Sequence, residues 1–572
     1  MRNKALPIAL LLALTPSALL ADTLFDNLDG ITLDAQGRVR HFTGIVVGTD
    51  GRIAEVLERT DKRPARVDYR VDGKGRVVIP GLIDSHLHLL AIGFAKLTLD
   101  LSETRSLQEA QAKIRAYAAE HPDRAWVIGS GWNPDAWGLG RFPTAAEIDA
   151  LVPDRPVWLT SADGHAGWAN SKALALAGVT AATADPAGGR IERTAGTTRP
   201  AGVLIDTAAA LVDRVVPPPR PEDRDVAFAL AQDALLRHGI TTATDMGTTI
   251  EDWQTFRRAG DIGRLSMRIM AYARGVDAMA LIGGPGPTPW LYDDRLRMNG
   301  VALAADGALA WRGALLKAPY ADDPRTRGDA LLSDTQLKNL MSRAAIDNFQ
   351  VAVDASGDAA TAEVLDAVDT LTQTYKGDRR WRIERAQAVD PADVRRFGSH
   401  GIVVSLQPLD LTTGRTAAEA RLGPQRLAGA YPWRSIAATG ATLAFGSDAP
   451  DHAPDPFAGM AAASTRQGDD DQPFGGWQPQ EKVTREAALA AYTAGAAYAG
   501  FAEGRFGRIE RGQRADFLVL DHDPLLATPA ELRGTRVLQT WINGRLAWEE
   551  GNRPLSKTAE PARTRGTGGE GR

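Results

Sequence analysis

Strand-length apolar runs that alternate with helical patterns are the feature that most constrains the fold of this chain. Such alternation favours parallel strands joined by helical crossovers, and eight strands are the number that closes a β/α barrel. Eight runs qualify, at about residues 79–86, 240–245, 266–272, 300–305, 350–354, 381–386, 402–406 and 442–448. The predicted fold class is therefore α/β, with a (β/α)8 TIM barrel as its main domain.

The two ends of the chain are both rich in short strand-like runs. With 572 residues, the chain is too long for one ordinary hydrophobic core, so a second domain is expected. Two β-rich pieces at opposite ends can pair into one unit. We therefore predict a small β-sandwich from residues 22–80 and 505–550, and the barrel from 81–504 with an insertion at about 100–235.

The N-terminus has the pattern of a secretory signal peptide. Arg2 and Lys4 precede a short apolar run, and Ala21 offers a small residue at the cleavage point. The run is too short to span a bilayer, although an uncleaved anchor and a buried strand are alternatives. We therefore expect residues 1–21 to be removed and the mature protein to be periplasmic, without membrane attachment.

Composition excludes several classes of function. The chain has no cysteine, which rules out disulfides, thiolate metal ligands and a cysteine nucleophile. Its net charge of −5 becomes −7 when residues 1–21 leave with two cations and no acids. A negative balance gives no electrostatic reason to expect nucleic acid as a partner. Residues 551–572 are rich in Gly, Thr and charge, and we predict a disordered tail there.

A His-x-His motif ends the first predicted strand. Alternate residues of a strand share a face, so His86 and His88 should point the same way at the carboxyl-terminal mouth of the barrel. Two converging imidazoles suit Zn or a similar divalent ion. The simpler alternative is a surface pair with no ligand. The apolar strand that runs directly into the motif favours a metal site.

The eighth predicted strand ends in a carboxylate, Asp448, within Gly446-Ser447-Asp448. The first and eighth strands of a closed barrel are neighbours, so Asp448 should lie beside the two histidines. There it could ligate a metal or act as general base. The alternative is a helix-capping aspartate, and the strand order favours the catalytic position.

These motifs and others form an ordered series along nearly the whole chain. The series comprises Pro80-Gly81-Leu82-Ile83-Asp84-Ser85-His86-Leu87-His88, Gly131-Trp132-Asn133-Pro134, Asp163-Gly164-His165-Ala166-Gly167-Trp168, Asp306-Gly307-Ala308-Leu309, Arg382-Ile383-Glu384, Gln407-Pro408 and Gly446-Ser447-Asp448. It resembles amidohydrolase family 3 of the amidohydrolase superfamily, in its N-substituted formamide deformylase-like branch. The resemblance implies a barrel with a small β-sandwich, and a metal-activated water that hydrolyses amide-type C–N bonds of a small-molecule substrate.

Three of the six ligand positions that the resemblance implies are substituted. The lysine expected to bridge two metals is Ala302, the histidine of the fifth strand is Asp354, and that of the sixth strand is Arg385. The residues that flank these positions match. A two-metal site therefore cannot form as in the family, whereas one ion on His86, His88 and Asp448, with Asp354 as a further candidate ligand, remains possible.

Arg385 opposes even a single metal. A guanidinium beside a cation costs roughly 4 kcal/mol per pair of unit charges at about 4 Å and an effective dielectric of about 20. A divalent ion would feel about twice that. We hypothesise that Arg385 instead forks between Asp354 and Asp448 and fills the vacated centre. The cofactor is then one Zn or another divalent ion, or none.

Four further side chains are candidates for binding the substrate: His165 and Trp168 in the insertion, His452 after the eighth strand, and Arg385. Two functions compete. One is a hydrolase with a single metal, in which Asp448 also takes a proton. The other is a catalytically impaired relative that binds a ligand. A sugar-active barrel with Asp354 and Asp448 as paired carboxylates ranks last. The substrate and the oligomeric state stay open.

Overall fold

The computed structural model describes residues 22–162, 164–186 and 188–551, so the predicted signal peptide and all but the first residue of the predicted tail lie outside it. Eight parallel strands form the central sheet, each paired with the next along the chain. They are β6 (Leu82–Leu87), β13 (Ile240–Thr248), β14 (Arg268–Arg274), β15 (Leu296–Ala304), β16 (Gln350–Ala355), β17 (Arg382–Arg385), β18 (Val403–Leu406) and β19 (Thr442–Phe445). The predicted barrel is confirmed.

The last strand returns to the first and nearly closes the barrel. The backbone N–H of Asp448 donates to the carbonyl of His86 at 2.7 Å, and that of His88 donates to the carbonyl of Ala449 at 2.9 Å. Gly446 permits this approach because a Cβ at that position would lie 2.5 Å from the nitrogen of His86. These contacts hold the ends of β6 and β19 side by side.

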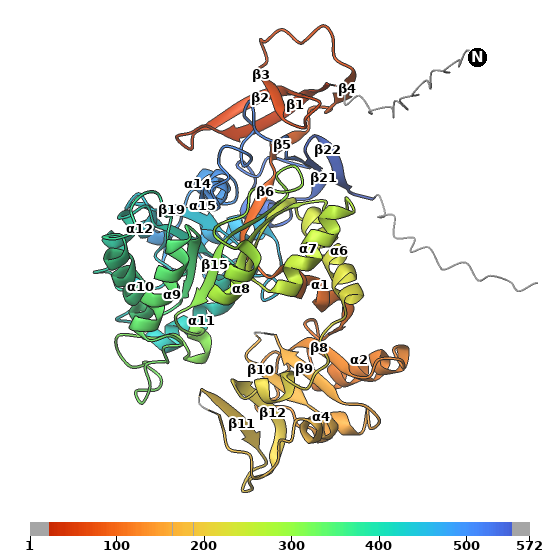
Figure 1. Cartoon of the computed structure of the whole chain (residues 1–572), viewed down its shortest axis with the longest axis vertical. Helices are drawn as coiled ribbons and strands as arrows, with labels where there is room; N and C mark the ends of the chain where they lie inside the picture. Colours follow the sequence, from red (N-terminus) through yellow and green to blue (C-terminus); the bar gives the residue numbers. More distant parts are fainter. Residues whose placement is uncertain (1–21, 163, 187, 552–572) are drawn as a thin grey trace, which may run out of the picture.

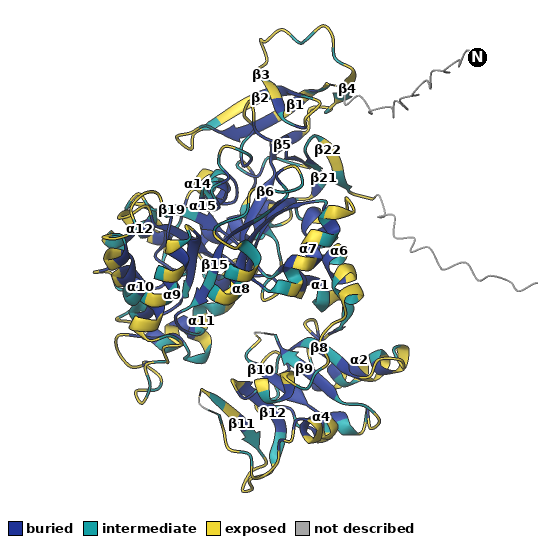
Figure 2. Ribbon diagram, viewed as in Figure 1, coloured by how far each residue is buried: buried dark blue, intermediate teal, exposed yellow. Residues whose placement is uncertain are grey.

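Helices cover the outside of the barrel, with their buried faces inward and their exposed faces outward (Figure 2). Two of them begin with reciprocal caps, Thr249 with Asp252 and Ser333 with Gln336. The helices are α1 (Leu89–Leu97), α6 (Pro221–Arg237), α7 (Ile250–Asp261), α8 (Gly275–Gly283), α9 (Asp334–Ile346), α10 (Asp358–Leu371), α11 (Asp410–Leu422), α12 (Trp433–Ala437), α13 (Pro456–Thr465), α14 (Arg485–Ala491) and α15 (Ala494–Ala499). Among the described residues, no helix combines the length and apolarity needed to cross a membrane.

The segment that follows β6 and α1 folds into a sheet of its own. Its strands run in the order β11-β12-β10-β9-β8-β7, and Figure 1 shows it on the opposite side of the barrel from β1–β3. The elements are β7 (Leu99–Asp100), α2 (Leu107–Glu120), β8 (Val127–Trp132), α3 (Ala146–Asp149), β9 (Val157–Ser161), β10 (Ala166–Ala169), α4 (Ser171–Leu176), β11 (Gly189–Arg193), β12 (Pro200–Asp206) and α5 (Ala210–Asp213). The next helix, α6, packs against α1 in the barrel layer. The inserted sheet and its helices therefore run from β7 to α5, and α6 belongs to the layer of helices around the barrel.

Both chain ends contribute to a third sheet. Strand β20 pairs antiparallel with β5, so residues near 518 lie beside residues near 79. The strands are β1 (Thr23–Leu33), β2 (Val39–Val47), β3 (Ile53–Leu57), β4 (Tyr69–Asp72), β5 (Val77–Pro80), β20 (Phe517–Leu520), β21 (Val537–Ile542) and β22 (Arg545–Glu549), with α16 (Pro529–Arg533) between β20 and β21. Phe25, Phe517 and Trp541 pack within 5.6 Å of one another between ring centroids. All eight strands belong to one hydrogen-bonded sheet.

A buried ion pair ties this sheet to the barrel. Arg268 of β14 donates to both carboxylate oxygens of Asp516, at 2.6 and 2.8 Å, and both side chains are buried. Removing one partner leaves an uncompensated buried charge. We expect Arg268→Met to destabilise the protein by about 3–5 kcal/mol in chemical denaturation. Arg40→Met is the control, since its pair with Glu58 is exposed, and should cost under about 1 kcal/mol. Equal losses in the two variants would contradict this role.

Candidate active site

A cavity of about 500 Å³ lies at the carboxyl-terminal mouth of the barrel, and we call it the mouth cavity. The insertion contributes Asn133 and His165 to its wall. Asp354, Arg385 and Asp448 come from the ends of three barrel strands or the residues directly after them. TIM-barrel enzymes carry their chemistry at this face. The mouth cavity is therefore the candidate active site.

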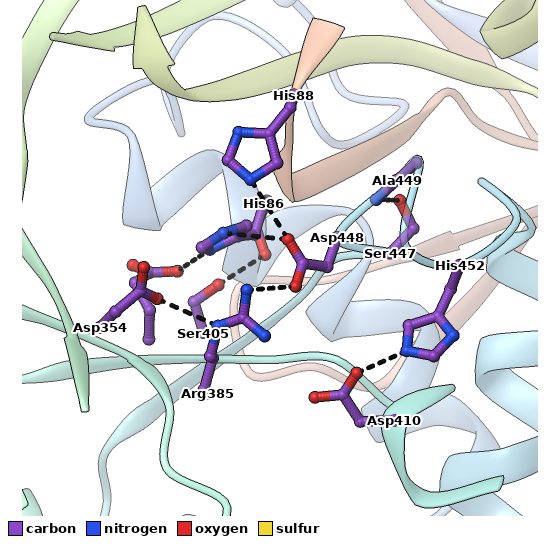
Figure 3. Close-up of polar contacts among 12 residues, drawn as sticks. His86, His88, Asp354, Arg385, Ser405, Asp410, Ser447, Asp448, Ala449 and His452 are labelled. Carbon is purple, nitrogen blue, oxygen red and sulfur yellow. Dashed lines mark hydrogen bonds and ion pairs between the residues drawn. The ribbon is translucent and has the colours of Figure 1, made fainter. Parts of the chain in front are cut away.

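The structure brings His86, His88 and Asp448 together (Figure 3). Nε2 of each histidine lies 3.4 Å from Oδ1 of Asp448, and one ligand atom from each residue lies within 4.8 Å of the others. His86 and Asp448 are buried, whereas the His88 side chain is 37% exposed. Two imidazoles and a carboxylate that converge on one point are a donor set typical of catalytic zinc.

Arg385 completes the cluster from the sixth strand. Its Nη2 lies 2.5 Å from Oδ2 of Asp448, and its Nε lies 3.5 Å from Oδ1 of Asp354 (Figure 3). Burial opposes the charge on Arg385, but Asp448 and Asp354 outweigh it and raise its pKa. Burial would likewise raise the pKa of Asp448, yet Arg385 and His86 hold that pKa well below its ordinary value. The three hypothesised partners therefore do meet, with the closer contact to Asp448.

The two partners of the short contact both have left-handed backbones. Asp448 has φ +59° and Arg385 has φ +70°. Neither is glycine, so each conformation costs of the order of 1–3 kcal/mol. At the end of β17 this turn aims Arg385 into the mouth cavity directly after Glu384, which also faces the site. Simple strand alternation could not give two consecutive residues to one face.

Glu384 orients the ring of His86 through its Nδ1. Its Oε2 lies 2.9 Å from Nδ1 of His86, and its Oε1 accepts from Nε of Arg382 at 2.8 Å. Nε2 of His86 has no hydrogen-bond partner among the described residues. Such a carboxylate behind a histidine fixes the ring and increases its basicity as a ligand. Sequence reasoning included Glu384 only as a family match, although the spacing of Arg382 and Glu384 on one strand face was a usable signal.

The charges around His86 favour a cation at Nε2. Burial lowers the pKa of His86, but Asp448, Glu384 and Asp354 outweigh it and raise the pKa to about 9. The same carboxylates would stabilise a metal ion in place of the proton.

We expect Glu384→Gln to weaken zinc binding by about 10–100-fold, since the amide cannot supply the negative charge behind His86. Competition against a chromogenic chelator would measure the change. Glu419→Gln is the control, because Glu419 lies on α11 and accepts from the indole of Trp477, away from the histidines. Wild-type affinity in Glu384→Gln would show that this contact does not support the ligand.

The part of the chain that the structure describes offers no second ligand set where the family pattern would need one. Ala302 packs inside the barrel beside an apolar cluster and carries no donor atom. Among the described residues, only His86, His88 and Asp448 form a group of three or more His, Asp or Glu side chains close enough to share one ion. Asp354 stays outside that group and contacts Arg385 instead.

Of the predicted substrate-binding residues, His165 and His452 both line the mouth cavity. Nδ1 of His165 lies 2.9 Å from Asp206, and its ring lies 5.8 Å from that of Trp311. Nε2 of His452 lies 2.7 Å from Oδ1 of Asp410 (Figure 3). Both histidines are therefore held by a carboxylate at the rim.

The expectation that Trp168 lines the pocket was wrong. Its side chain is fully buried in the core of the inserted sheet, where Nε1 donates to the carbonyl of Thr144 at 2.9 Å. The rings of Trp132 and Trp137 pack against it at 6.1 and 6.2 Å. On β10 the residue occupies the inner face, so it packs and does not bind.

Among the side chains of the cavity wall that sequence reasoning missed are Trp311 and Asp410. Trp311 sits in a short 3₁₀ turn (Leu309–Trp311) after β15, and Asp410 opens α11. Neither position follows a periodic pattern or a metal-ligand spacing, and no local signal marks them.

Comparison with known proteins assigns the sequence to a family. The sequence pattern that describes the amidohydrolase family matches residues 70–547. The chain belongs to the amidohydrolase family. The predicted resemblance is thereby confirmed, together with its branch. The amidohydrolase is 30% identical to the N-substituted formamide deformylase of Arthrobacter pascens over 92% of this chain and 98% of that protein.

Other relatives match over similar lengths. Protein LONG AFTER FAR-RED 3 of Arabidopsis thaliana is 32% identical over 93% of this amidohydrolase and 92% of its own length. Among solved structures, an uncharacterized metal-dependent hydrolase from Pyrococcus furiosus superimposes with a TM-score of 0.71 at 26% identity. That match covers 88% of this chain and all of the other. These likenesses support hydrolysis of C–N bonds as the chemistry of the family to which the chain belongs.

Proposed function

We propose that this amidohydrolase hydrolyses a non-peptide, amide-type C–N bond of a small molecule at a centre that holds one divalent ion, with zinc as the first candidate. The proposal rests on one observation: the two carboxylate oxygens of Asp448 face different partners. Its Oδ1 faces the two histidines at 3.4 Å, while its Oδ2 contacts Arg385 at 2.5 Å. One oxygen thus remains for a metal even with Arg385 in place.

The donor set fits a single ion. Nε2 of His86 is buried and makes no hydrogen bond among the described residues, and its Nδ1 is held by Glu384. His86, His88 and Asp448 would hold the ion, as in catalytic zinc centres with three protein ligands. When bound, such an ion would polarise the carbonyl group of an amide and would lower the pKa of water, so that hydroxide is available as nucleophile near neutral pH.

The chain's own residues would then divide the remaining work. Arg385 lines the mouth cavity, where its charge can stabilise the negative charge that develops on the attacked carbonyl oxygen. Asp448 would receive a proton from the attacking water, but its lowered pKa makes it a weak base. His165 and Trp311 form an aromatic wall that can exclude water from one side of a bound substrate.

A second candidate is a ligand-binding protein without catalysis. The guanidinium of Arg385 lies 2.5 Å from Asp448 and also contacts Asp354. It therefore supplies the positive charge that a metal would otherwise bring. The fold itself does not decide between binding and catalysis, because function depends on the site.

A substrate screen with metal control distinguishes the two. Purified protein would be tested on N-substituted formamides, N-acyl amines and ring amides, before and after treatment with chelator and after zinc is returned. Turnover that disappears with chelator and returns with zinc supports the hydrolase. Saturable thermal stabilisation by one of these amides, with no turnover under any metal condition, supports the binding protein.

We also propose that the protein works in the periplasm. The support is the charged and apolar pattern of residues 1–21, which end in a small residue. Cell fractionation with mass spectrometry of the mature N-terminus tests it. A first residue at or near Asp22 is expected, and full-length protein in the cytoplasm would contradict the proposal.

A further inference from the structure

A second cavity, of about 240 Å³, lies at the amino-terminal ends of β15 and β16, at the other end of the barrel from the mouth cavity. We call it the basal cavity. Three cationic side chains line it: Arg297, Lys376 and Arg379. The carboxylate in its wall, Asp378, already accepts from Nε of Arg380 at 2.9 Å. The basal cavity therefore has an excess of positive charge.

Its two arginines have no carboxylate within ion-pair distance among the described residues. Nε of Arg297 donates to the carbonyl of Thr288 at 3.2 Å, and burial lowers the pKa of Arg297. Nη1 of Arg379 donates to the carbonyl of Ala345 and to Asn348, whereas its Nε is buried and has no hydrogen-bond partner within residues 22–162, 164–186 and 188–551. Desolvated guanidinium groups with spare donors are the usual protein ligands of oxyanions.

A buried acceptor in the same wall adds a requirement for the ligand. Asn299 is 3% exposed, and its Nδ2 donates to the carbonyl of Gly500 at 2.8 Å. Its Oδ1 has no hydrogen-bond partner in the described part of the chain. Because a buried unpaired acceptor is costly, a bound molecule that carries a donor would be favoured here.

We propose that the basal cavity is a binding site for a small oxyanion that also carries a hydroxyl group, such as hydrogen phosphate or a short hydroxycarboxylate. Arg297 and Arg379 would donate to the anionic oxygens, and Oδ1 of Asn299 would accept from the hydroxyl group. The cavity is far larger than the roughly 10–15 Å³ that one water needs. This site is separate from the proposed hydrolytic centre and does not depend on it.

The basal cavity adjoins the hydrogen bonds that orient His86. Oε1 of Gln350, in the cavity wall, accepts from the hydroxyl of Tyr272 at 2.5 Å. That hydroxyl accepts from Nη1 of Arg382 at 3.1 Å, and Arg382 donates to Glu384, which contacts His86. All five side chains are buried. A series of hydrogen bonds therefore connects the wall of the basal cavity to His86, the candidate metal ligand.

Phosphate and sulfate distinguish this site from general attraction of anions. Sulfate has nearly the same shape as phosphate but carries no proton at neutral pH, so it cannot donate to Asn299. Titration calorimetry on metal-free wild-type protein should show one saturable phosphate site, with sulfate at least about tenfold weaker. A parallel titration with glycolate shows whether the site prefers a hydroxycarboxylate or phosphate. Equal binding of phosphate and sulfate, or no binding of phosphate and glycolate, would overturn the proposal.

Variants locate the binding. Arg297→Gln and Arg379→Gln should each weaken phosphate binding at least tenfold. Arg395→Gln, at an exposed position elsewhere, should not change it. Arg385→Gln should also retain binding, which separates the basal cavity from the guanidinium of the mouth cavity. Circular dichroism would show whether each variant is folded. Loss of binding in Arg385→Gln with retention in folded Arg297→Gln and Arg379→Gln would place the anion at the mouth and refute the inference.

Discussion

Replacing Arg385 with histidine is expected to raise the affinity for zinc at least about a hundredfold. The substitution removes the fixed positive charge of a guanidinium whose Nη2 lies 2.5 Å from Oδ2 of Asp448, a residue of the candidate metal site. At a separation of about 4 Å and a dielectric of about 20, the repulsion of a divalent ion is roughly 8 kcal/mol. Realising only a third of that gives about two orders of magnitude in the dissociation constant. Chelator competition at equal ionic strength measures it.

Arg385→Lys is the matched control, because it keeps the positive charge while losing the forked contact. Its zinc affinity should stay near that of the wild type or below it. If Arg385→His and Arg385→Lys bind zinc equally, charge repulsion is not what limits metal binding. If Arg385→His binds zinc more weakly than the wild type, Arg385 supports the centre instead of opposing it.

Asp448→Asn is expected to lower kcat by about 10²–10⁴-fold on whichever amide the wild type hydrolyses. The amide keeps nearly the same shape but cannot accept a proton, and it is a poorer metal ligand. It also leaves Arg385 with Asp354 alone, at 3.5 Å. Steady-state kinetics with added zinc would measure the loss.

Asp451→Asn serves as the control for charge in the same cavity. Asp451 lines the mouth cavity but is not part of the three-residue metal group. We expect less than about a tenfold change in kcat. Comparable losses in Asp448→Asn and Asp451→Asn would indicate a general effect of cavity charge, and full activity in Asp448→Asn would remove Asp448 from the mechanism.

The parts of the structure that follow from local periodicity could be predicted from the sequence. The eight strands were found because each is a short apolar run between helical patterns. His86 and His88 were placed together because alternate strand residues share a face, and Asp448 because the eighth strand closes on the first. The pairing of Arg385 with Asp354 and Asp448 could be predicted from charge. Asp354 and Arg385 stand where the family pattern has two histidines on adjacent strands, and one added acid compensates one added base.

Other features depend on backbone geometry and packing that the sequence does not display. The left-handed turns at Asp448 and Arg385 set where the side chains point. Aspartate adopts this conformation more often than most residues, but arginine does not, so the sequence gives no signal for the turn at Arg385. The burial of Trp168 could not be predicted, because its motif does not show which face of β10 is covered. The layer to which α6 belongs depends on its contact with α1, which the sequence does not display.

We propose that one metal ion and one guanidinium share the centre that two metal ions would otherwise occupy. Anomalous diffraction at the zinc edge from crystals grown with zinc tests it most directly, with metal content measured on the same protein. We expect one zinc per chain, bound by His86, His88 and Oδ1 of Asp448, with Arg385 still on Oδ2. No zinc at the histidines, or two ions with Arg385 turned out of the cavity, would contradict the account.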